Sequence, residues 1–459
     1  MKEQKMTREN NKRISRRDFM GGAAAALAFT IVPGHVLAQP PSGKVNVAAI
    51  GAGGMGAGNT RACAAAGANI VALCDVDWKK GDEGFSRFPD AKKYKDFRKM
   101  LDTEKSIEAV IVATPDHFHT VAAMAAMRRG KHVYVQKPLT RLVSEARALT
   151  EAARKYKVVT QMGNQGHSGN GVRDICEWIW DGAIGEIREV HAWTNRPVWP
   201  QGIDRPQGED PIPATLDWDL WIGPAPMRPF KALPDNPNES VYCPFRWRGW
   251  WDFGGGALAD MACHVLDPVF WALKLKYPTS VEACCTPVNN ETFPLASIVH
   301  YEFPAREGMP PVKIHWYDGG RTPEKPEALG DMKIGQAASN VLFIGSKGVL
   351  RCGEYGDEPH LFPLELMKDY KRPAKTLKRI NTSHEGNWLE ACKTGGQATS
   401  NFDYAGPFTE MVTMGNLAIR PENVGKKLLW DGEKMRVSND EKANEYVRMH
   451  YREGWSLEM

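Results

Sequence analysis

The sequence predicts an α/β protein with two domains: a doubly wound parallel sheet, then an α+β domain with an open, mostly antiparallel sheet. From residue 44 to about residue 161, short apolar runs alternate with helix-forming stretches, which is typical of parallel sheets. After about residue 170, β-rich runs follow one another with few helices between them, which favours antiparallel pairing. The length of 459 residues is sufficient for both domains even without an N-terminal leader.

Residues 1–38 have the features of an export signal. The pair Arg16-Arg17 stands just before an uncharged, Ala-rich run at 19–32, and small residues at 36–38 offer a cleavage site. The apolar run is too short and too rich in Ala and Gly for a membrane span. These features are typical of a twin-arginine signal peptide, so we expect a periplasmic or otherwise exported protein that begins at Gln39 and has no membrane anchor.

The charge of the chain gives no support for a polyanionic partner. The leader holds seven Lys and Arg against three Asp and Glu, so the net charge of +4 resides there and the remainder carries 52 charges of each sign. Nucleic acid and anionic membranes are therefore not expected partners, and a small-molecule substrate is. The nine cysteines form no C-x-x-C pair, and we expect few or no disulfides.

The stretch Gly51-Ala-Gly-Gly-Met-Gly56 has the G-x-G-x-x-G spacing of a dinucleotide-binding turn. It follows an apolar, β-branched run at 45–50 and precedes a helix-forming stretch at 59–66, which is the expected context. Gly51 permits a tight turn, Gly53 lets the backbone approach a pyrophosphate, and Gly56 lets the helix pack closely on the strand.

The predicted cofactor site continues at the end of the second strand. A β-rich run at 68–74 ends at Asp75, where a carboxylate accepts hydrogen bonds from a ribose diol. This favours NAD, although Lys79 and Lys80 nearby keep NADP open as an alternative. We predict a Rossmann domain over residues 39–162. Its cofactor contacts in this part are Gly51, Gly53, Gly54, Met55, Gly56 and Asp75.

Polar residues directly after the other predicted strands are further candidates, because parallel sheets bind ligands at the carboxyl ends of their strands. The runs at 109–113, 132–135 and 158–161 predict three such strands. We expect the segments after the first two to lie beside the cofactor and the segment after the third to contact substrate hydroxyls. The candidates are Thr114, Pro115, Gln136 and Lys137 for the cofactor, and Asn164, Gln165 and His167 for the substrate.

The second domain is expected to span residues 163–459. It combines helix-forming stretches at 171–181 and 260–273 with a Pro- and Trp-rich region at 197–251 that predicts a long loop. Tryptophans of this loop, Trp251 among them, suit either stacking on sugar rings or burial in a subunit contact. The β-rich runs lie at 187–194, 280–285, 297–303, 312–317, 340–344 and 348–352.

Two of these runs predict self-association. Apolar residues at 341–344 and 296–299 occur in pairs rather than alternating with polar ones, which predicts burial on both faces of the sheet. A large apolar face rarely stays exposed in a soluble monomer. We therefore expect a homodimer or homotetramer in which the sheets meet symmetrically.

With these segments in order, the chain resembles the Gfo/Idh/MocA family of oxidoreductases, and its export signal makes it glucose–fructose oxidoreductase-like. Two positions depart from the family's usual residues: Gln136 replaces a Glu and Asp116 replaces an Asn. The segments that carry the resemblance are the glycine stretch, Thr114–His119, Gln136–Pro138, Asp260–His264 and the turn Gly345–Gly348.

The resemblance implies that Lys137 hydrogen-bonds both the substrate hydroxyl and the cofactor ribose, and that His119 borders the cofactor. Asp260 and His264 are spaced i, i+4 and so share one face of a helix. An imidazole is suited to take the hydroxyl proton as hydride leaves, and a neighbouring carboxylate orients it. An arbitrary pair of this kind is usually structural, but the family match and the preceding Gly254–Gly256 favour catalysis and substrate contact.

We expect an exported, NAD(P)-dependent oxidoreductase that moves hydride between a sugar or glycoside hydroxyl carbon and a tightly bound nicotinamide. Two alternatives stay open: redox-assisted hydrolysis of a glycoside, which needs the same catalytic residues, and non-catalytic sugar binding on the same fold. No metal site is predicted, because His117 and His119 lack further ligands at suitable spacing.

Overall fold

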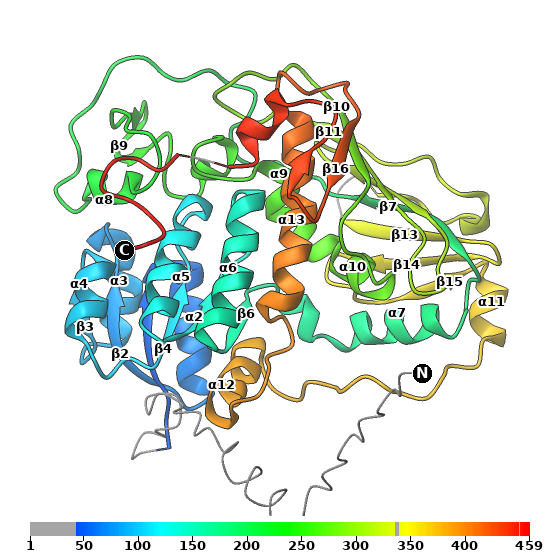
Figure 1. Ribbon diagram of the computed structural model, residues 1–459, viewed down its shortest axis with the longest axis horizontal. Helices are drawn as coiled ribbons and strands as arrows, with labels where there is room; N and C mark the ends of the chain where they lie inside the picture. The colour runs from blue at the N-terminus through cyan, green and yellow to red at the C-terminus, as the bar shows by residue number, and fades with distance from the viewer. Residues whose placement is uncertain (1–42, 336–338, 449) are drawn as a thin grey trace, which may run out of the picture. The chain divides into compact units, whose positions relative to one another are not determined.

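The computed structural model describes residues 43–335, 339–448 and 450–459, so the expected export signal lies outside the described chain. The described residues form a six-stranded sheet, a nine-stranded sheet and a two-stranded hairpin. Figure 1 shows the six-stranded sheet and its helices in blue and cyan, and the nine-stranded sheet mainly in green and yellow. The α/β class with a parallel and a mostly antiparallel sheet is confirmed.

The six-stranded sheet is entirely parallel, in the order β3-β2-β1-β4-β5-β6. The chain runs from β1 toward one edge and then returns to the other side of β1 with β4. The carboxyl ends of β1 and β4 therefore flank the switch point at which such sheets bind ligands. The strands are β1 (Asn46–Ile50), β2 (Asn69–Cys74), β3 (Lys92–Tyr94), β4 (Ala109–Val112), β5 (His132–Val135) and β6 (Thr160–Met162).

The glycine turn after β1 is too crowded for side chains. The first helix begins at Met55, earlier than the 59–66 stretch predicts, because Gly51 turns the chain at φ 88°. A Cβ at Gly53 would lie 2.2 Å from the carbonyl oxygen of Lys80, and one at Gly56 would lie 1.9 Å from that of Gly51. The helices of this part are α2 (Met55–Ala65), α3 (Trp78–Arg87), α4 (Phe97–Thr103), α5 (His119–Arg128) and α6 (Val143–Tyr156).

The nine-stranded sheet has the order β15-β14-β13-β7-β12-β11-β10-β16-β17. Its neighbours pair antiparallel except β7 and β12, which are parallel. The strands are β7 (Ile187–Trp193), β10 (Ser280–Cys285), β11 (Ser297–Phe303), β12 (Val312–Tyr317), β13 (Asn340–Gly345), β14 (Val349–Gly353), β15 (His360–Phe362), β16 (Leu428–Asp431) and β17 (Arg436–Val437).

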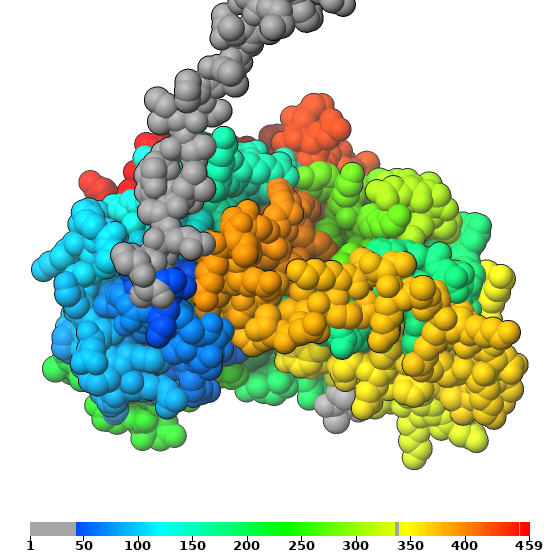
Figure 2. Space-filling model, turned by 90° about the horizontal axis from the view of Figure 1, so that it is seen from below, coloured from blue at the N-terminus to red at the C-terminus, as the bar shows by residue number. Residues whose placement is uncertain are grey.

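Helix α13 (Phe402–Ile419) joins the two sheets, because it packs on α6 and also on β10 and β11. The helix expected at 260–273 is divided into α9 (Gly256–Val265) and α10 (Asp267–Ala272), which pack on α13 and α7 (Asn170–Trp180). After α11 (Leu364–Asp369) the chain returns to α2 through α12 (His384–Thr394), and Figure 2 shows this yellow-to-orange part crossing one face.

The face of the nine-stranded sheet away from α13 is less apolar than predicted. Leu342, His191, His315 and His300 are direct cross-strand partners and so lie in one row on that face. On the β13 side, Leu342 packs in an apolar cluster with Leu329 from the same chain. The expected burial on both faces therefore holds for β13, whereas β11 and β12 alternate and present histidines.

Candidate active site

A cleft of about 780 Å³ lies at the carboxyl ends of the parallel strands, a volume that suits a nucleotide-sized ligand. The structure brings nine of the eleven residues predicted for the cofactor to its wall, while Gly56 lies beneath the glycine turn and His119 lies elsewhere. The nine are Gly51, Gly53, Gly54, Met55, Asp75, Thr114, Pro115, Gln136 and Lys137.

The glycine turn offers backbone N–H groups to negatively charged acceptors. The Ala52 N–H donates to Asp75 Oδ2 at 2.8 Å, and the Gly54 N–H donates to Glu83 Oε2 at 3.1 Å. Backbone amides at the start of a helix are a common site for phosphate. The turn therefore fits the pyrophosphate of a dinucleotide, and Glu83 marks one place where an anionic oxygen is already bound.

Asp75 links the glycine turn to the segment after β2. Besides Ala52, the Asp77 N–H donates to it, at 3.0 Å to Oδ1. Burial raises the pKa of Asp75 to about 6, although these backbone hydrogen bonds act in the opposite direction. The side chain is thus a carboxylate at neutral pH, on the wall where a ribose diol is expected.

Residues 195–255, here called the covering segment, form the opposite wall of the cleft. The Trp78 N–H donates to Thr215 O at 3.0 Å and the Asp217 N–H donates to Val76 O at 2.9 Å, so the segment pairs with the chain after β2. Lys80 adds an ion pair with Glu239 at 3.2 Å. The segment contains α8 (Trp218–Ile222) and the hairpin of β8 (Ala232–Leu233) and β9 (Asn236–Ser240).

The region predicted as a long loop is held by its own apolar core. Trp218 stacks on Trp221 with centroids 4.8 Å apart, and Tyr242 packs edge-on against Trp250 at 4.8 Å. These rings form one buried cluster with Phe253. Trp218 and Trp250 are therefore core residues of this segment. Neither sugar stacking nor a subunit contact, the two roles expected for the loop tryptophans, applies to them.

Three charged side chains meet beside the cleft: Lys137 and Arg248 line it, and Asp260 lies behind them. Lys137 Nζ donates to Asp260 Oδ1 and to the Asp260 carbonyl oxygen, both at 2.9 Å. Arg248 Nε, from the covering segment, donates to the same Oδ1 at 2.9 Å. Burial alone raises the pKa of Asp260, but Lys137 and Arg248 outweigh it and hold this pKa well below its usual range.

His264 lies one turn further along α9, but Asp260 does not orient it as expected. The structure pairs the carboxylate with the two cations, and His264 Nδ1 has no hydrogen-bond partner among the described residues. Its ring lies 4.9 Å from that of Tyr355. Burial, and then Lys137, lower the pKa of His264 to about 3, so the imidazole is neutral and its cation is disfavoured.

Two family models match this chain. Residues 45–164 match the oxidoreductase family's NAD-binding Rossmann fold, and residues 187–303 match its C-terminal alpha/beta domain. The two matches together span just over half of the chain. The chain belongs to the Gfo/Idh/MocA oxidoreductase family. Its first domain is thus an NAD-binding Rossmann domain.

The family's sugar dehydrogenases are among its relatives. Levoglucosan dehydrogenase of Pseudarthrobacter phenanthrenivorans is 28% identical over 234 residues, 49% of this chain and 50% of that protein. Inositol 2-dehydrogenase of Salmonella typhimurium is 27% identical over 146 residues, 31% of this chain and 43% of that protein. The matches thus span half or less of these relatives.

Solved structures share the fold. Levoglucosan dehydrogenase in complex with NADH and levoglucosan has a TM-score of 0.54 and 19% identity, covering 82% of this chain and 96% of its own. The WlbA dehydrogenase of Bordetella pertussis, in complex with NADH and UDP-GlcNAcA, has a TM-score of 0.57 and 15% identity, covering 84% and 99%.

Asp116, one of the two departures from the Gfo/Idh/MocA pattern, lies beside the cluster of Lys137, Asp260 and Arg248. It is buried, with 2% of its surface exposed. Its Oδ2 accepts the Gly255 N–H at 3.1 Å, while its Oδ1 has no partner among the described residues. Burial raises the pKa of Asp116 to about 7, against the opposing effects of Arg248 and Lys137. The carboxyl therefore titrates near neutrality.

Asn164 and His167, predicted to contact substrate, are instead buried in a network around Asp267. Asn164 Nδ2 donates to Asp267 Oδ1 at 3.0 Å, and His167 Nδ1 lies 3.0 Å from both oxygens of that carboxylate. The Ser400 hydroxyl also donates to Asn164 Oδ1, at 2.7 Å. A buried carboxylate needs such partners, which is why the polar groups turn inward. Gln165 is half-buried and does not line the cleft.

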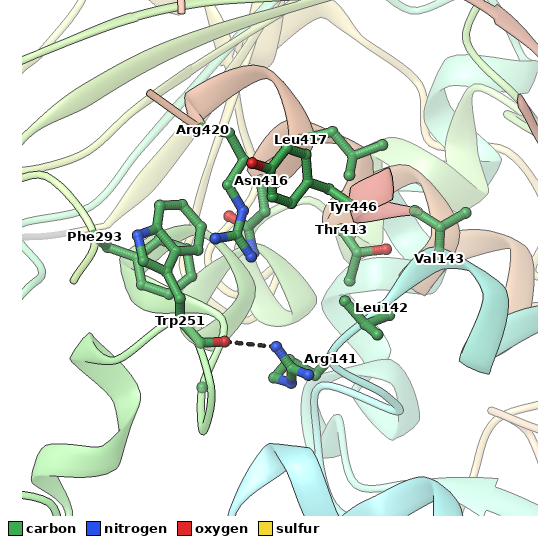
Figure 3. Close-up of a pocket in the computed structure, with 11 residues that line it drawn as sticks. Arg141, Leu142, Val143, Trp251, Phe293, Thr413, Asn416, Leu417, Arg420 and Tyr446 are labelled. Atoms are coloured by element: carbon green, nitrogen blue, oxygen red, sulfur yellow. Dashed lines mark hydrogen bonds between the residues drawn. The ribbon is translucent and has the colours of Figure 1, made fainter. Parts of the chain in front are cut away.

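Trp251, also predicted to contact substrate, is packed away from the cleft. Its Nε1 donates to Asn289 O at 3.0 Å, and its ring lies between Phe293, at 3.6 Å, and the Arg420 guanidinium, at 3.9 Å. Figure 3 shows it beside a cavity of about 20 Å³, with Arg141 donating to its carbonyl oxygen. Trp251 therefore positions the chain that leads into α9.

His119 is not a wall of the cofactor cleft either. Its Nδ1 lies 2.8 Å from Pro138 O and its Nε2 lies 2.9 Å from Thr114 O. His119 therefore connects the segment after β4 with the segment after β5, both of which line the cleft, without lining it itself. Gln136 is held similarly, because its Nε2 donates to Asn59 Oδ1 at 2.8 Å.

Arg248 and Tyr355 were not predicted from the sequence, and neither was a role for Asp116. Only the departure of Asp116 from the family pattern was a signal in the sequence, since Arg248 lies in a short 3₁₀ helix and Tyr355 in a turn. Among the described residues, no cluster of His, Cys, Asp and Glu is arranged to hold a metal ion. No helix in the described ranges is long and apolar enough to cross a membrane.

The raised pKa of Asp116 predicts a pH-dependent stability that Asp116→Asn removes. The protonated form is favoured in the folded state, so its stabilising contribution is full below about pH 4 and is lost as the pH rises through about 7. We expect the free energy of unfolding of the wild type, relative to the variant, to fall by a few kcal/mol over this window. Urea denaturation of both proteins from pH 4 to 8 measures this difference, and a difference that does not change with pH would contradict it.

Proposed function

We propose that this chain is an NAD-dependent oxidoreductase that moves hydride between a hydroxyl-bearing carbon of a sugar and the nicotinamide. The observation that carries the proposal is the cluster of Lys137, Asp260 and Arg248 beside the cleft, with a neutral His264 next to it. The activities named for the relatives, levoglucosan and inositol dehydrogenation, support the substrate class.

Lys137, His264 and Asp260 each have a separate role in such a reaction. When bound, the nicotinamide accepts or supplies the hydride. Lys137 has three N–H donors, of which Asp260 takes two, so one is left to polarise the reacting oxygen. The neutral His264 imidazole is the group that takes or returns the hydroxyl proton, and it does so at its other ring nitrogen, because Nδ1 is buried. Asp260 is too acidic to act as the base and instead fixes Lys137.

Lys137→Ala and His264→Ala should each lower kcat by ~10²–10⁴, the usual effect of removing a positioned acid or base. The dissociation constant of NADH, measured by fluorescence titration, should change little, because the phosphate contacts lie in the glycine turn. Lys99→Ala, on the exposed side of α4, is the matched control. Turnover like that of the wild type in either variant would remove that residue from the mechanism.

NAD should bind more tightly than NADP, because the Asp75 carboxylate repels a 2′-phosphate. Lys80, which would attract that phosphate, is already paired with Glu239. We expect NADPH to bind at least ~10-fold more weakly than NADH, and Asp75→Ala to narrow the ratio. Tighter binding of NADPH would refute the assignment of Asp75.

We also expect the nucleotide to stay tightly bound, because the covering segment forms the opposite wall of the cleft. Mass spectrometry of the nucleotide released on denaturation tests this.

We also propose that the chain is exported, which the leader supports, and that it self-associates, which the half-buried outer face of β11 and β12 supports. Expression of the full sequence in a bacterium with the twin-arginine pathway, followed by fractionation and light scattering, tests both. The expected product is periplasmic, begins at Gln39 and has the mass of two or four chains. Protein that stays in the cytoplasm with its leader contradicts the first proposal, and the mass of one chain contradicts the second.

A further inference from the structure

Arg248 is the point where the covering segment reaches the Lys137–Asp260 pair. Its Nε donates to Asp260 Oδ1 at 2.9 Å, and its Nη1 makes a longer bond to Phe245 O at 3.3 Å. The side chain lines the cleft and keeps 20% of its surface exposed.

The guanidinium is held in place without using all its donors. Its carbon lies 4.2 Å from the ring centroid of Trp247, 4.4 Å from that of Phe245 and 5.7 Å from that of Trp199. Such rings hold a guanidinium by cation–π attraction and leave its N–H groups unused. A guanidinium has five N–H donors, and no hydrogen bond from Nη2 is present among the described residues. The Nη edge is therefore fixed and still able to bind an acceptor.

The charges around Arg248 do not balance. Lys137 and Arg248 are two cations facing the single carboxylate of Asp260, while His264 is neutral and Asp116 is largely protonated below pH 7. An uncompensated charge in a partly buried site is unfavourable, so a ligand that brings a negative charge is stabilised there.

The position of Arg248 assigns that negative charge to the reacting molecule. The cofactor's pyrophosphate fits the glycine turn at the end of β1. Arg248 Nε and Lys137 Nζ bond the same oxygen, so the two nitrogens are at most about 6 Å apart. An anion on the Nη edge thus lies within a few bonds of the hydroxyl that Lys137 polarises.

We propose that the substrate carries a carboxylate near the oxidised hydroxyl, as in a uronate or an aldonate, and that Arg248 binds it. The planar fork of the guanidinium matches the two oxygens of a carboxylate. This inference rests on the proposed oxidoreductase function and adds a substrate class to it.

The test compares sugars that differ in one group, D-glucose with D-glucuronate and D-galactose with D-galacturonate, by cofactor reduction. The wild type should favour the acid over the neutral sugar by roughly 10- to 100-fold in kcat/KM, as expected for one charge-assisted pair. Arg248→Gln should bring this ratio close to one, whatever happens to the absolute rates. Arg248→Lys should keep part of it, because a charge remains without the fork.

Arg246→Gln is the matched control, because Arg246 lies two residues away and pairs with Glu239 rather than Asp260. It should leave the ratio unchanged. A wild type that favours the neutral sugars, or a ratio that Arg248→Gln does not change, overturns the inference. So does a loss of NADH affinity in Arg248→Gln with the ratio intact, since Arg248 would then serve the cofactor.

Binding measured without turnover separates the two proposals. Calorimetry of the uronates added to the NADH-loaded protein should show binding that Arg248→Gln weakens by at least ~10-fold. If no sugar is oxidised but this binding is present, the oxidoreductase proposal fails and the role of Arg248 stands. If neutral sugars are oxidised and the uronates do not bind, the oxidoreductase proposal stands and the role of Arg248 fails.

Discussion

The site depends on one carboxylate oxygen, Asp260 Oδ1, which accepts from both Lys137 and Arg248. These residues come from a strand end of the parallel sheet, the covering segment and helix α9, which packs on α13. A buried charge without its partner is strongly unfavourable, so each of these three parts stabilises the arrangement of the other two. The active site therefore forms only when all three are in place, and the Rossmann domain alone would leave Lys137 without its partner.

Burial disfavours the charged form of every titratable group in the site, and the neighbours of each group decide whether burial prevails. Asp260 and Asp116 are both buried, and Lys137 and Arg248 act to lower the pKa of each. Even so, the pKa of Asp260 is lowered overall and that of Asp116 is raised to about 7. The difference is that Asp260 receives two charged hydrogen bonds, whereas Asp116 receives one backbone N–H. His264 has no hydrogen bond at Nδ1 that would stabilise its cation, so burial keeps it neutral. The environment thus separates a fixed anion, a titrating acid and a neutral base within one site.

The sequence predicted what local patterns determine. Alternating or continuous apolar runs fixed β10, β11 and β12 to the residue, and the rule of strand ends brought Asp75, Thr114 and Lys137 to one cleft. It could not predict partners distant in the sequence. The i, i+4 spacing suggested that Asp260 serves His264, but Lys137, 123 positions away, takes the carboxylate. Asn164 and His167 stand at a strand end, yet Asp267 draws them into the interior. Such contacts depend on how two sheets pack, which no local period encodes.

The covering segment shows how selectivity can be separated from the cofactor site. Its aromatic cluster is an apolar core of its own, and its backbone pairs with the chain after β2. Arg248 is held by Trp247, Phe245 and Asp260, all residues of this chain, so little side-chain entropy remains to be lost on binding. The glycine turn fits the dinucleotide, and Lys137 lies at the strand end beside it, so neither belongs to the covering segment. Variation in the covering segment alone would then change which substrate is accepted while the turn and the lysine stay the same.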